Sequence, residues 1–235
     1  ILCFGEALID FHAQPPADPS SQPESLPHAG GAPANVAVAV AKLGGNATFA
    51  GMLGADAFGD LLLRSLDDAG VDMRYVQRTD KANTALAFVS LDARGERSFS
   101  FYRPPAADLL FRSAHFDERA FAAATIFHVC SNSLTEQAIA TVTLEGMARA
   151  RAAGALVSFD MNLRPALWPA GEDPCPRLWA TLEAADLVKL SVEELDFMAA
   201  AAGSREAVYQ RLWRGHASCL IVTDGAEEIR WLTPS

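Results

Sequence analysis

The sequence has 235 residues, of which 50% are hydrophobic and 20% are charged, and its formal net charge is −10 at pH 7. This length is sufficient for one large hydrophobic core, so we expect a single α/β domain spanning residues 1–235. The negative charge and the absence of a Lys/Arg run exclude nucleic-acid and anionic-membrane partners, because both need a concentrated positive surface.

The chain shows no targeting or metal-binding pattern. No apolar run approaches the ~20 residues of a membrane span, and the first residues do not resemble a signal peptide, so we expect a cytoplasmic protein. Cys3, Cys130, Cys175 and Cys219 are far apart and form no C-x-x-C pair, so neither a zinc site nor a disulfide framework is predicted. We interpret Cys3, Cys130 and Cys219 as small core residues of strands.

Apolar runs of strand length alternate along the chain with stretches of helical periodicity, and the runs are apolar on both faces. The runs expected to form strands are 1–10, 47–54, 125–132, 155–162, 186–191 and 219–225. The stretches expected to form helices are 32–45, 58–70, 134–154 and 192–203, and each ends at a glycine that suits a helix C-cap. The pattern predicts an α/β fold with a mostly parallel central sheet and helices on both faces.

Two segments interrupt this alternation. Residues 11–31 are too polar and too rich in proline for a central strand, whereas residues 84–104 alternate polar and apolar side chains around a turn at 92–97. We therefore expect a small β-sheet beside the main one, built from about residues 11–28 and 72–108. Such a sheet could act as a lid or merely extend an edge, and the sequence favours neither strongly.

Polar residues follow the apolar strands where ligands bind in open parallel sheets. They are Asp10, Asn132, Asp160, Asn162, Arg164, Lys189, Ser191, Thr223 and Asp224. A single residue of this kind is more often a helix cap than a ligand contact. Polar residues follow five of the strands, and this coincidence favours a binding site. Helix caps in an unrelated α/β protein remain an alternative.

The chemistry of these residues suits a sugar beside a nucleotide. Arg103, Arg164 and Lys189 supply cations for phosphate oxygens, while Asp10 and Asn35 supply a carboxylate and an amide for vicinal hydroxyls. The patterns G-x-x-x-x-G-K-[ST] and G-x-G-x-x-G after the first strand are absent, so neither a Walker-type ATPase nor a dinucleotide enzyme is supported.

The stretch "GGAPAN", which ends at Asn35, is followed by Ala37 and by glycines at 44 and 54. With "GEALID", "FYRPPAAD", "DMNLRPALWP", "KLSVEEL" and "VTDGAE" in order, the chain resembles the ribokinase-like sugar kinases over essentially its whole length. The motifs look most like those of the fructokinases. The resemblance implies a three-layer ribokinase-like fold, a kinase that uses ATP and Mg²⁺, and a β-sheet lid that covers the substrate. It leaves open a monovalent cation such as K⁺ and a homodimer through the lid.

The resemblance also implies a role for each matching residue. Asp10, Gly30, Gly31 and Asn35 match positions that contact sugar hydroxyls, with the glycines allowing a close approach of the backbone. Arg103 matches a lid residue that reaches over the substrate, and Asn162 and Arg164 match positions near the transferred phosphate. The remaining matches, on the nucleotide side, are Lys189, Ser191, Thr223 and Gly225, with Glu194 reaching Mg²⁺ through water.

One family motif is absent from these residues. An Asp-Thr-x-Gly-Ala-Gly-Asp segment supplies the general base in such kinases, and no Gly-Ala pair here is followed by Gly-Asp. Because the chain stops where that segment would come, we expect a longer protein rather than a relative that has lost catalysis.

The sequence therefore predicts transfer of the γ-phosphoryl group of ATP to a free hexose, with D-fructose as the first choice. Kinases of 2-keto-3-deoxygluconate, ribose or nucleosides are alternatives, and Arg103 could bind the carboxylate of a keto acid. A sugar-binding sensor without catalysis is a further alternative.

Overall fold

The computed structural model describes residues 1–14, 24–91, 97–103 and 105–234. Their contacts cluster in two compact units. Unit 1 comprises Ile1–Phe4 and Arg112–Ser235, and unit 2 comprises Gly5–Phe111. The organisation expected from the sequence, one domain with a lid, stays a prediction.

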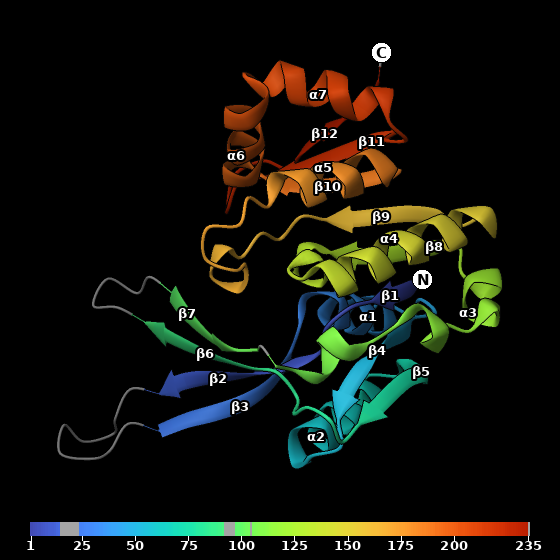
Figure 1. Ribbon diagram of the computed structural model, residues 1–235, viewed down its shortest axis with the longest axis vertical. Coiled ribbons are helices and arrows are strands. Elements are labelled where there is room, and N and C mark those ends of the chain that lie inside the picture. Colours follow the sequence, from blue (N-terminus) through green and yellow to red (C-terminus); the bar gives the residue numbers. More distant parts are fainter. Residues whose placement is uncertain (15–23, 92–96, 104, 235) are drawn as a thin grey trace. The chain divides into compact units, whose positions relative to one another are not determined.

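Unit 1 is built on a mostly parallel sheet with the strand order β12-β11-β10-β9-β8-β1 (Figure 1). The strands are β1 (Leu2–Phe4), β8 (Ile126–Cys130), β9 (Leu156–Asp160), β10 (Leu187–Ser191), β11 (Cys219–Thr223) and β12 (Arg230–Leu232). Strands β1, β8, β9, β10 and β11 are parallel to their neighbours, and β12 is antiparallel to β11.

The helices of unit 1 connect these strands. They are α3 (Glu118–Ala123), α4 (Gln137–Ala152), α5 (Cys175–Ala184), α6 (Val192–Ala202) and α7 (Arg205–Arg214), with short 3-10 turns η2 (Ser113–His115), η3 (Ser131–Leu134) and η4 (Pro165–Leu167). The steps from β8 to β11 all run in one direction, so right-handed crossovers place the connecting helices on one face of the sheet. Contacts of α5 with both α4 and α7 agree with this arrangement.

The helix-covered face of the sheet holds the core of unit 1. Side chains alternate along β10 and β11, and those under the helices, such as Val188, Leu190 and Val222, are fully buried. Their neighbours on the other face, including Lys189 and Thr223, are partly exposed. The strands therefore hold a rigid row of accessible polar side chains.

Unit 2 contains a parallel strand pair and a separate four-stranded sheet. The pair is β4 (Thr48–Gly54) with β5 (Asp72–Thr79), and it is accompanied by α1 (Ala32–Lys42), α2 (Ala57–Asp68) and η1 (Ala107–Leu110). The small sheet has the order β3-β2-β6-β7, formed by β2 (Leu8–Gln14), β3 (Glu24–Gly30), β6 (Leu86–Leu91) and β7 (Arg97–Tyr102). The predicted α/β class, with a mostly parallel sheet and a small separate sheet, is confirmed.

Several predicted boundaries need correction. The run 1–10 is not one strand, because Gly5 has φ 146° and divides it into β1 of the parallel sheet and β2 of the small sheet. Strand β5 lies inside the range 72–108 assigned to the lid, yet it pairs with β4. Helices α3, α5 and α7 were not predicted. Residues 15–23 of the expected lid and residues 92–96 of the expected turn lie outside the described residues.

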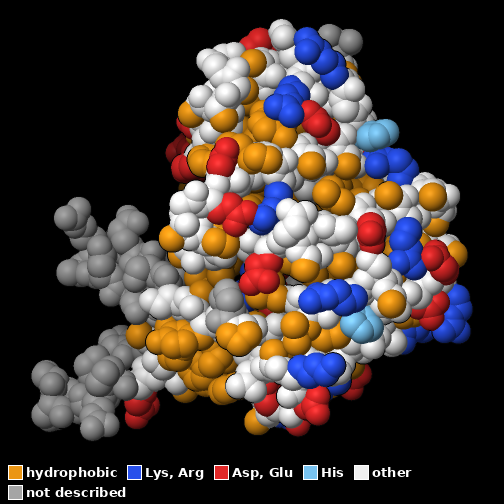
Figure 2. Space-filling view, viewed as in Figure 1, with side chains coloured by type: hydrophobic (Ala, Val, Ile, Leu, Met, Phe, Trp, Pro, Cys, Tyr) orange, Lys and Arg blue, Asp and Glu red, His pale blue; other side chains and the backbone are white. Residues whose placement is uncertain are grey.

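The distribution of charged side chains on the surface agrees with the absence of a Lys/Arg run from the sequence. Figure 2 shows Lys and Arg side chains interspersed with Asp and Glu on the visible face, without a large basic region. None of the described helices is both long and apolar enough to cross a membrane.

Candidate active site

The carboxyl ends of β9, β10 and β11 bring four predicted site residues to one edge of the parallel sheet. Asp160 is the register partner of Lys189, and Ser191 is the register partner of Thr223. Parallel pairing places these strand ends side by side, which confirms the expected convergence within unit 1.

Lys189 and Asp160 form an ion pair on the accessible face of the sheet. Lys189 Nζ lies 3.1 Å from Asp160 Oδ1, and the two side chains are 31% and 24% exposed. The partner of Lys189 was not predicted, because Asp160 precedes it by 29 residues and only the register joins them. A phosphate oxygen could compete with this carboxylate for the ammonium group, since both are anionic acceptors.

Glu194 clamps the loop after β9 to the first turn of α6. Its Oε1 accepts a hydrogen bond from the Leu163 N–H, and its Oε2 accepts one from the Ser191 N–H, each at 2.7 Å. Ser191 returns the contact as the helix N-cap, because its Oγ accepts from the Glu194 N–H at 3.2 Å. The spacing S-x-x-E could have revealed the capping box, but not the bond to Leu163.

The clamped loop carries the residues expected beside the transferred phosphate. Asn162 has φ 38°, in the left-handed region that residues with a side chain rarely adopt. Its carbonyl accepts a hydrogen bond from Ser131 Oγ at 3.4 Å, and Arg164 Nη1 donates to the Leu163 carbonyl at 3.1 Å. Contacts from η3, α6 and the loop itself therefore hold a strained backbone in place, as is common at functional sites.

The residues expected at the nucleotide pocket follow β11 directly. Thr223 ends the strand and is partly exposed, while Gly225 is exposed with φ 55°. The turn thus needs a glycine or a residue that tolerates the left-handed region.

In unit 2, Asp10 and Gly30 lie together on the small sheet. A Cβ on Gly30 would stand 2.1 Å from Asp10 Oδ2, so the carboxylate occupies the space that any side chain would need. Asp10 is partly buried, and burial raises its pKa above the usual carboxyl value. The positive charges of His12 and His28 oppose that rise. Asp10 is therefore an accessible carboxylate with a perturbed pKa.

Gly31 allows α1 to begin against the backbone of "GEALID". It has φ 103°, and a Cβ there would meet the Glu6 carbonyl oxygen at 2.5 Å. Glu6 is fully buried, and its Oε1 accepts a hydrogen bond from the Ala32 N–H at 3.1 Å. The bare backbone thus serves contacts within the protein, and the exposed Asn35 lies one turn into the helix.

Arg103, which the resemblance places over the substrate, is buried directly after β7. Its side chain is 2% exposed, and its Nε and Nη2 donate to Asp108 Oδ2 at 2.8 and 2.5 Å. Asp108 lies in η1 and is itself buried. A buried guanidinium requires a partner, and Arg103 finds one in Asp108; its contact with the substrate stays a prediction.

The buried cysteines match their interpretation as core residues, and His128 is buried in the same region of the sheet. Cys3, Cys130 and Cys219 are buried and unbridged. His128 is 6% exposed, with Nδ1 at 3.0 Å from Ser158 Oγ. Burial lowers the pKa of His128 to about 4, so its ring stays neutral at neutral pH.

The described residues contain no cluster of three or more His, Cys, Asp or Glu side chains that could hold a metal ion directly. Both oxygens of Glu194 already accept backbone N–H groups. A divalent ion at this residue fits best through water, because each carboxylate oxygen keeps one further lone pair.

Comparisons with known proteins all find similarity to carbohydrate kinases. The model of the pfkB family of carbohydrate kinases matches residues 1–235. Fructokinase-1 of Zea mays is 42% identical over 232 residues, which cover 98% of this chain and 72% of that protein.

Two solved structures are similar over nearly the whole chain. The crystal structure of a fructokinase with bound ATP from Xylella fastidiosa is 59% identical, with a TM-score of 0.95, over 99% of this chain and 74% of that one. A fructokinase double mutant from Vibrio cholerae O395, bound to fructose, ADP and potassium ion, is 33% identical, with a TM-score of 0.86, over 99% and 72% of the two chains.

Proposed function

Because the chain belongs to the pfkB family of carbohydrate kinases, we propose that it transfers the γ-phosphoryl group of ATP to D-fructose. The observation that carries this proposal is the row of accessible polar side chains at the ends of β9, β10 and β11, which suits a nucleotide phosphate. The 59% identity to a fructokinase with bound ATP supports both the donor and the acceptor.

The residues divide into sugar and phosphate contacts. Asp10 accepts hydrogen bonds from sugar hydroxyls, Asn35 adds an amide, and Gly30 and Gly31 contact the sugar through their backbone.

Arg164 stabilises charge on the phosphoryl oxygens, beside Asn162 in the loop that Glu194 holds. Lys189, Ser191, Thr223 and Gly225 contact the nucleotide. Mg²⁺, when bound through water at Glu194, offsets the negative charge of the phosphates. A monovalent cation such as K⁺ belongs to the same proposal, since the Vibrio enzyme was solved with potassium ion.

The acceptor hydroxyl must lose a proton, and these residues supply no Gly-Ala-Gly-Asp segment for that step. The buried His128 is unsuited to it, because its ring is hydrogen bonded to Ser158 inside the sheet. A contact of Arg103 with the substrate belongs to the same proposal, and it would require Arg103 to exchange its partner Asp108 for the substrate.

A coupled ADP-release assay on the gene product in full tests the proposal. Fructose, glucose, ribose and 2-keto-3-deoxygluconate are compared with ATP and Mg²⁺, and we expect turnover mainly with fructose. A higher kcat/KM for another sugar would replace fructose as the substrate. Sugar binding without turnover on any of the four would favour a sensor instead.

We further propose that two copies associate through the small sheet. The Phe88 ring stacks on Phe11 and meets Tyr102 edge to face, with ring centroids 4.9 and 5.3 Å apart, and Phe88 and Tyr102 are 36% and 68% exposed. Clusters of exposed aromatic rings are typical of protein interfaces. Analytical ultracentrifugation should find a dimer that the double change Phe88→Ser and Tyr102→Ser converts to monomer; a monomeric wild type would contradict this.

We also place the reaction in the cytoplasm. The four free cysteines support a reducing compartment, and the cytoplasm supplies ATP. Fractionation of cells that express the gene product would test the location.

A further inference from the structure

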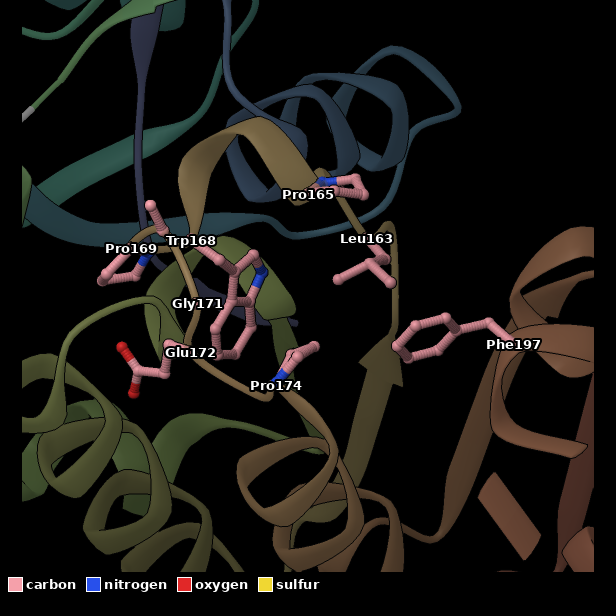
Figure 3. A pocket seen from close by; sticks show the side chains of 9 residues that line it. Leu163, Pro165, Trp168, Pro169, Gly171, Glu172, Pro174 and Phe197 are labelled. Carbon is pink, nitrogen blue, oxygen red and sulfur yellow. The ribbon is translucent and has the colours of Figure 1, made fainter. Parts of the chain in front are cut away.

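Each unit contains a carboxylate at the start of a helix that holds a distant segment of the chain. In unit 1 it is Glu194 of α6, which holds the loop after β9 through the Leu163 N–H. Figure 3 shows this loop, whose Leu163 and Trp168 line a mostly apolar cavity of about 260 Å³ together with Phe197 of α6. In unit 2 the corresponding carboxylate is that of Asp56, the N-cap of α2, to which no role in the site has been assigned.

The Asp56 carboxylate accepts three hydrogen bonds from two segments of the chain. Its Oδ1 accepts from the Gly59 N–H in α2 and from Thr84 Oγ1, each at 2.8 Å. Its Oδ2 accepts from the Thr84 N–H at 2.7 Å. Burial raises the pKa of Asp56, but these hydrogen bonds outweigh burial and bring the pKa below the ordinary carboxyl value. The ionised carboxylate therefore holds Thr84, which lies 28 positions further along the chain.

Thr84 is also bonded to the end of β4. Its side chain is 3% exposed, and its Oγ1 accepts a hydrogen bond from the Gly54 N–H at 3.1 Å. A Cβ on Gly54 would stand 2.6 Å from the Thr84 nitrogen, so a side chain at position 54 would push the two segments apart. The glycine at 54, which follows "GGAPAN" in the family resemblance, thus allows this close approach within unit 2.

The segment that Asp56 holds is bonded directly to the strand that carries Asp10. The Ala85 carbonyl accepts a hydrogen bond from the Ile9 N–H at 3.1 Å, and both residues are buried. Ile9 precedes Asp10 in β2, while Ala85 precedes β6, the parallel neighbour of β2. A displacement of Thr84 should therefore shift the start of β2, and the Asp10 carboxylate with it.

We propose that Asp56 is a positioning residue of the sugar site, because its carboxylate fixes residues 83–85 and, through them, the start of β2 with Asp10. Both of its oxygens are used within unit 2, so Asp56 acts without contacting the sugar. This inference rests on the proposed function, in which Asp10 binds sugar hydroxyls. Loss of the clamp should weaken sugar binding and leave nucleotide binding unchanged.

Asp56→Asn removes one acceptor oxygen and keeps the shape of the side chain. Asn is as favourable an N-cap as Asp, so α2 should still begin at the same place while the Thr84 N–H loses its acceptor. Isothermal titration calorimetry should find a several-fold lower affinity for fructose and an unchanged affinity for ATP. Asp60→Asn is the matched control and should bind fructose normally, because Asp60 lies in the same helical turn and pairs with Arg78 instead.

A double-mutant cycle separates positioning from general destabilisation. In an Asp10→Asn background, Asp56→Asn should lower the sugar affinity little further, because both changes act on the same contact. Equal losses in the two backgrounds would show that Asp56 acts independently of Asp10 and would overturn the proposal. If the ADP-release assay selects a sugar other than fructose, the cycle is measured with that sugar.

The hydroxyl group of Thr84 allows a second test of the clamp. Thr84→Ser keeps the hydroxyl that donates to Asp56 and should bind the sugar as the wild type does. Thr84→Val has nearly the same shape without the hydroxyl, and it should lower the sugar affinity several-fold. Equal sugar affinity of these two variants would contradict the role of the clamp.

Hydrogen exchange tests the clamp without any ligand. In Asp56→Asn, the Thr84 and Ile9 amides should exchange faster, while the Val157 amide of unit 1, bonded to Asp186, should keep its rate. Equal acceleration at Val157, which indicates a general loss of stability, or an unchanged rate at Ile9 would overturn the proposal. Local acceleration in a protein that binds none of the sugars would contradict the proposed function, and with it the role in sugar binding.

Discussion

Gly30 has no room for a side chain, because the Asp10 carboxylate fills that space. Substitution Gly30→Ala should therefore displace Asp10 and weaken fructose binding by roughly tenfold or more, as expected when a charged hydrogen-bond acceptor is lost. ATP affinity should remain unchanged. Isothermal titration calorimetry measures both. Ala29→Ser, at an exposed neighbouring position, is the control and should bind fructose normally; equal affinity of both variants would contradict the role of Asp10.

Asp10 also gives fructose binding a characteristic pH dependence. Burial raises its pKa, so the carboxylate, and with it the affinity, is lost at a higher pH on acidification than for an ordinary aspartate. His12 and His28 lower that pKa, so His12→Asn with His28→Asn should raise it further and move the loss of affinity to still higher pH. Calorimetry across the acid range measures the shift. His115→Asn, in unit 1, should leave the profile unchanged.

Helix α6 and the loop after β9 are joined by one carboxylate, so their geometry depends on Glu194. A glutamine has only one acceptor oxygen, so Glu194→Gln should leave the N–H of Leu163 or Ser191 unpaired. We expect a loss of about 1–3 kcal/mol in the free energy of unfolding, together with faster hydrogen exchange at these two amides. Turnover should fall while the KM for fructose changes little.

The neighbouring residue provides a matched control for this clamp. Glu193 is exposed in the first turn of α6, and Glu193→Gln removes the same charge without removing an acceptor of the Leu163 amide. In Glu193→Gln, the free energy of unfolding and the hydrogen-exchange rates of the Leu163 and Ser191 amides should therefore match those of the wild type. Similar losses in both variants would point to charge near the helix N-terminus rather than to the clamp.

At the scale of whole units, a buried ion pair ties the small sheet to the rest of unit 2. Arg103 follows β7, Asp108 lies in η1, and η1 packs against β4. Arg103→Met should cost about 3–5 kcal/mol of unfolding free energy, because it leaves the Asp108 carboxylate buried without its cation. Adding Asp108→Leu should recover most of that loss. Urea denaturation measures the free energy of unfolding of the wild type, of Arg103→Met and of the double variant.

An exposed pair serves as the reference for this double-mutant series. Arg119 and Asp117 form an ion pair in which the arginine side chain is 84% exposed, so Arg119→Met should cost less than about 1 kcal/mol. If Arg103→Met instead lowered fructose affinity without affecting unfolding, the expected contact of Arg103 with the substrate would be supported.

Local patterns were sufficient for much of the fold and part of the site. Periodicity identified four of the helices and the parallel strands except β5, and the polar residues after those strands indicated one edge of the sheet, because strand ends of parallel neighbours coincide. Helices α3, α5 and α7 were missed. The motif "KLSVEEL" indicated a role for Glu194 but not its bond to Leu163, which lies 31 positions away.

The sequence by itself determined the α/β class, the family resemblance and the candidate residues, since these depend on short-range periodicity and on motifs. Tertiary structure alone decided that Gly5 divides the first run between two sheets, that Arg103 is buried against Asp108, and that Trp168 faces a cavity. Each of these outcomes depends on packing between segments that the chain brings together only on folding, so no local pattern could specify it.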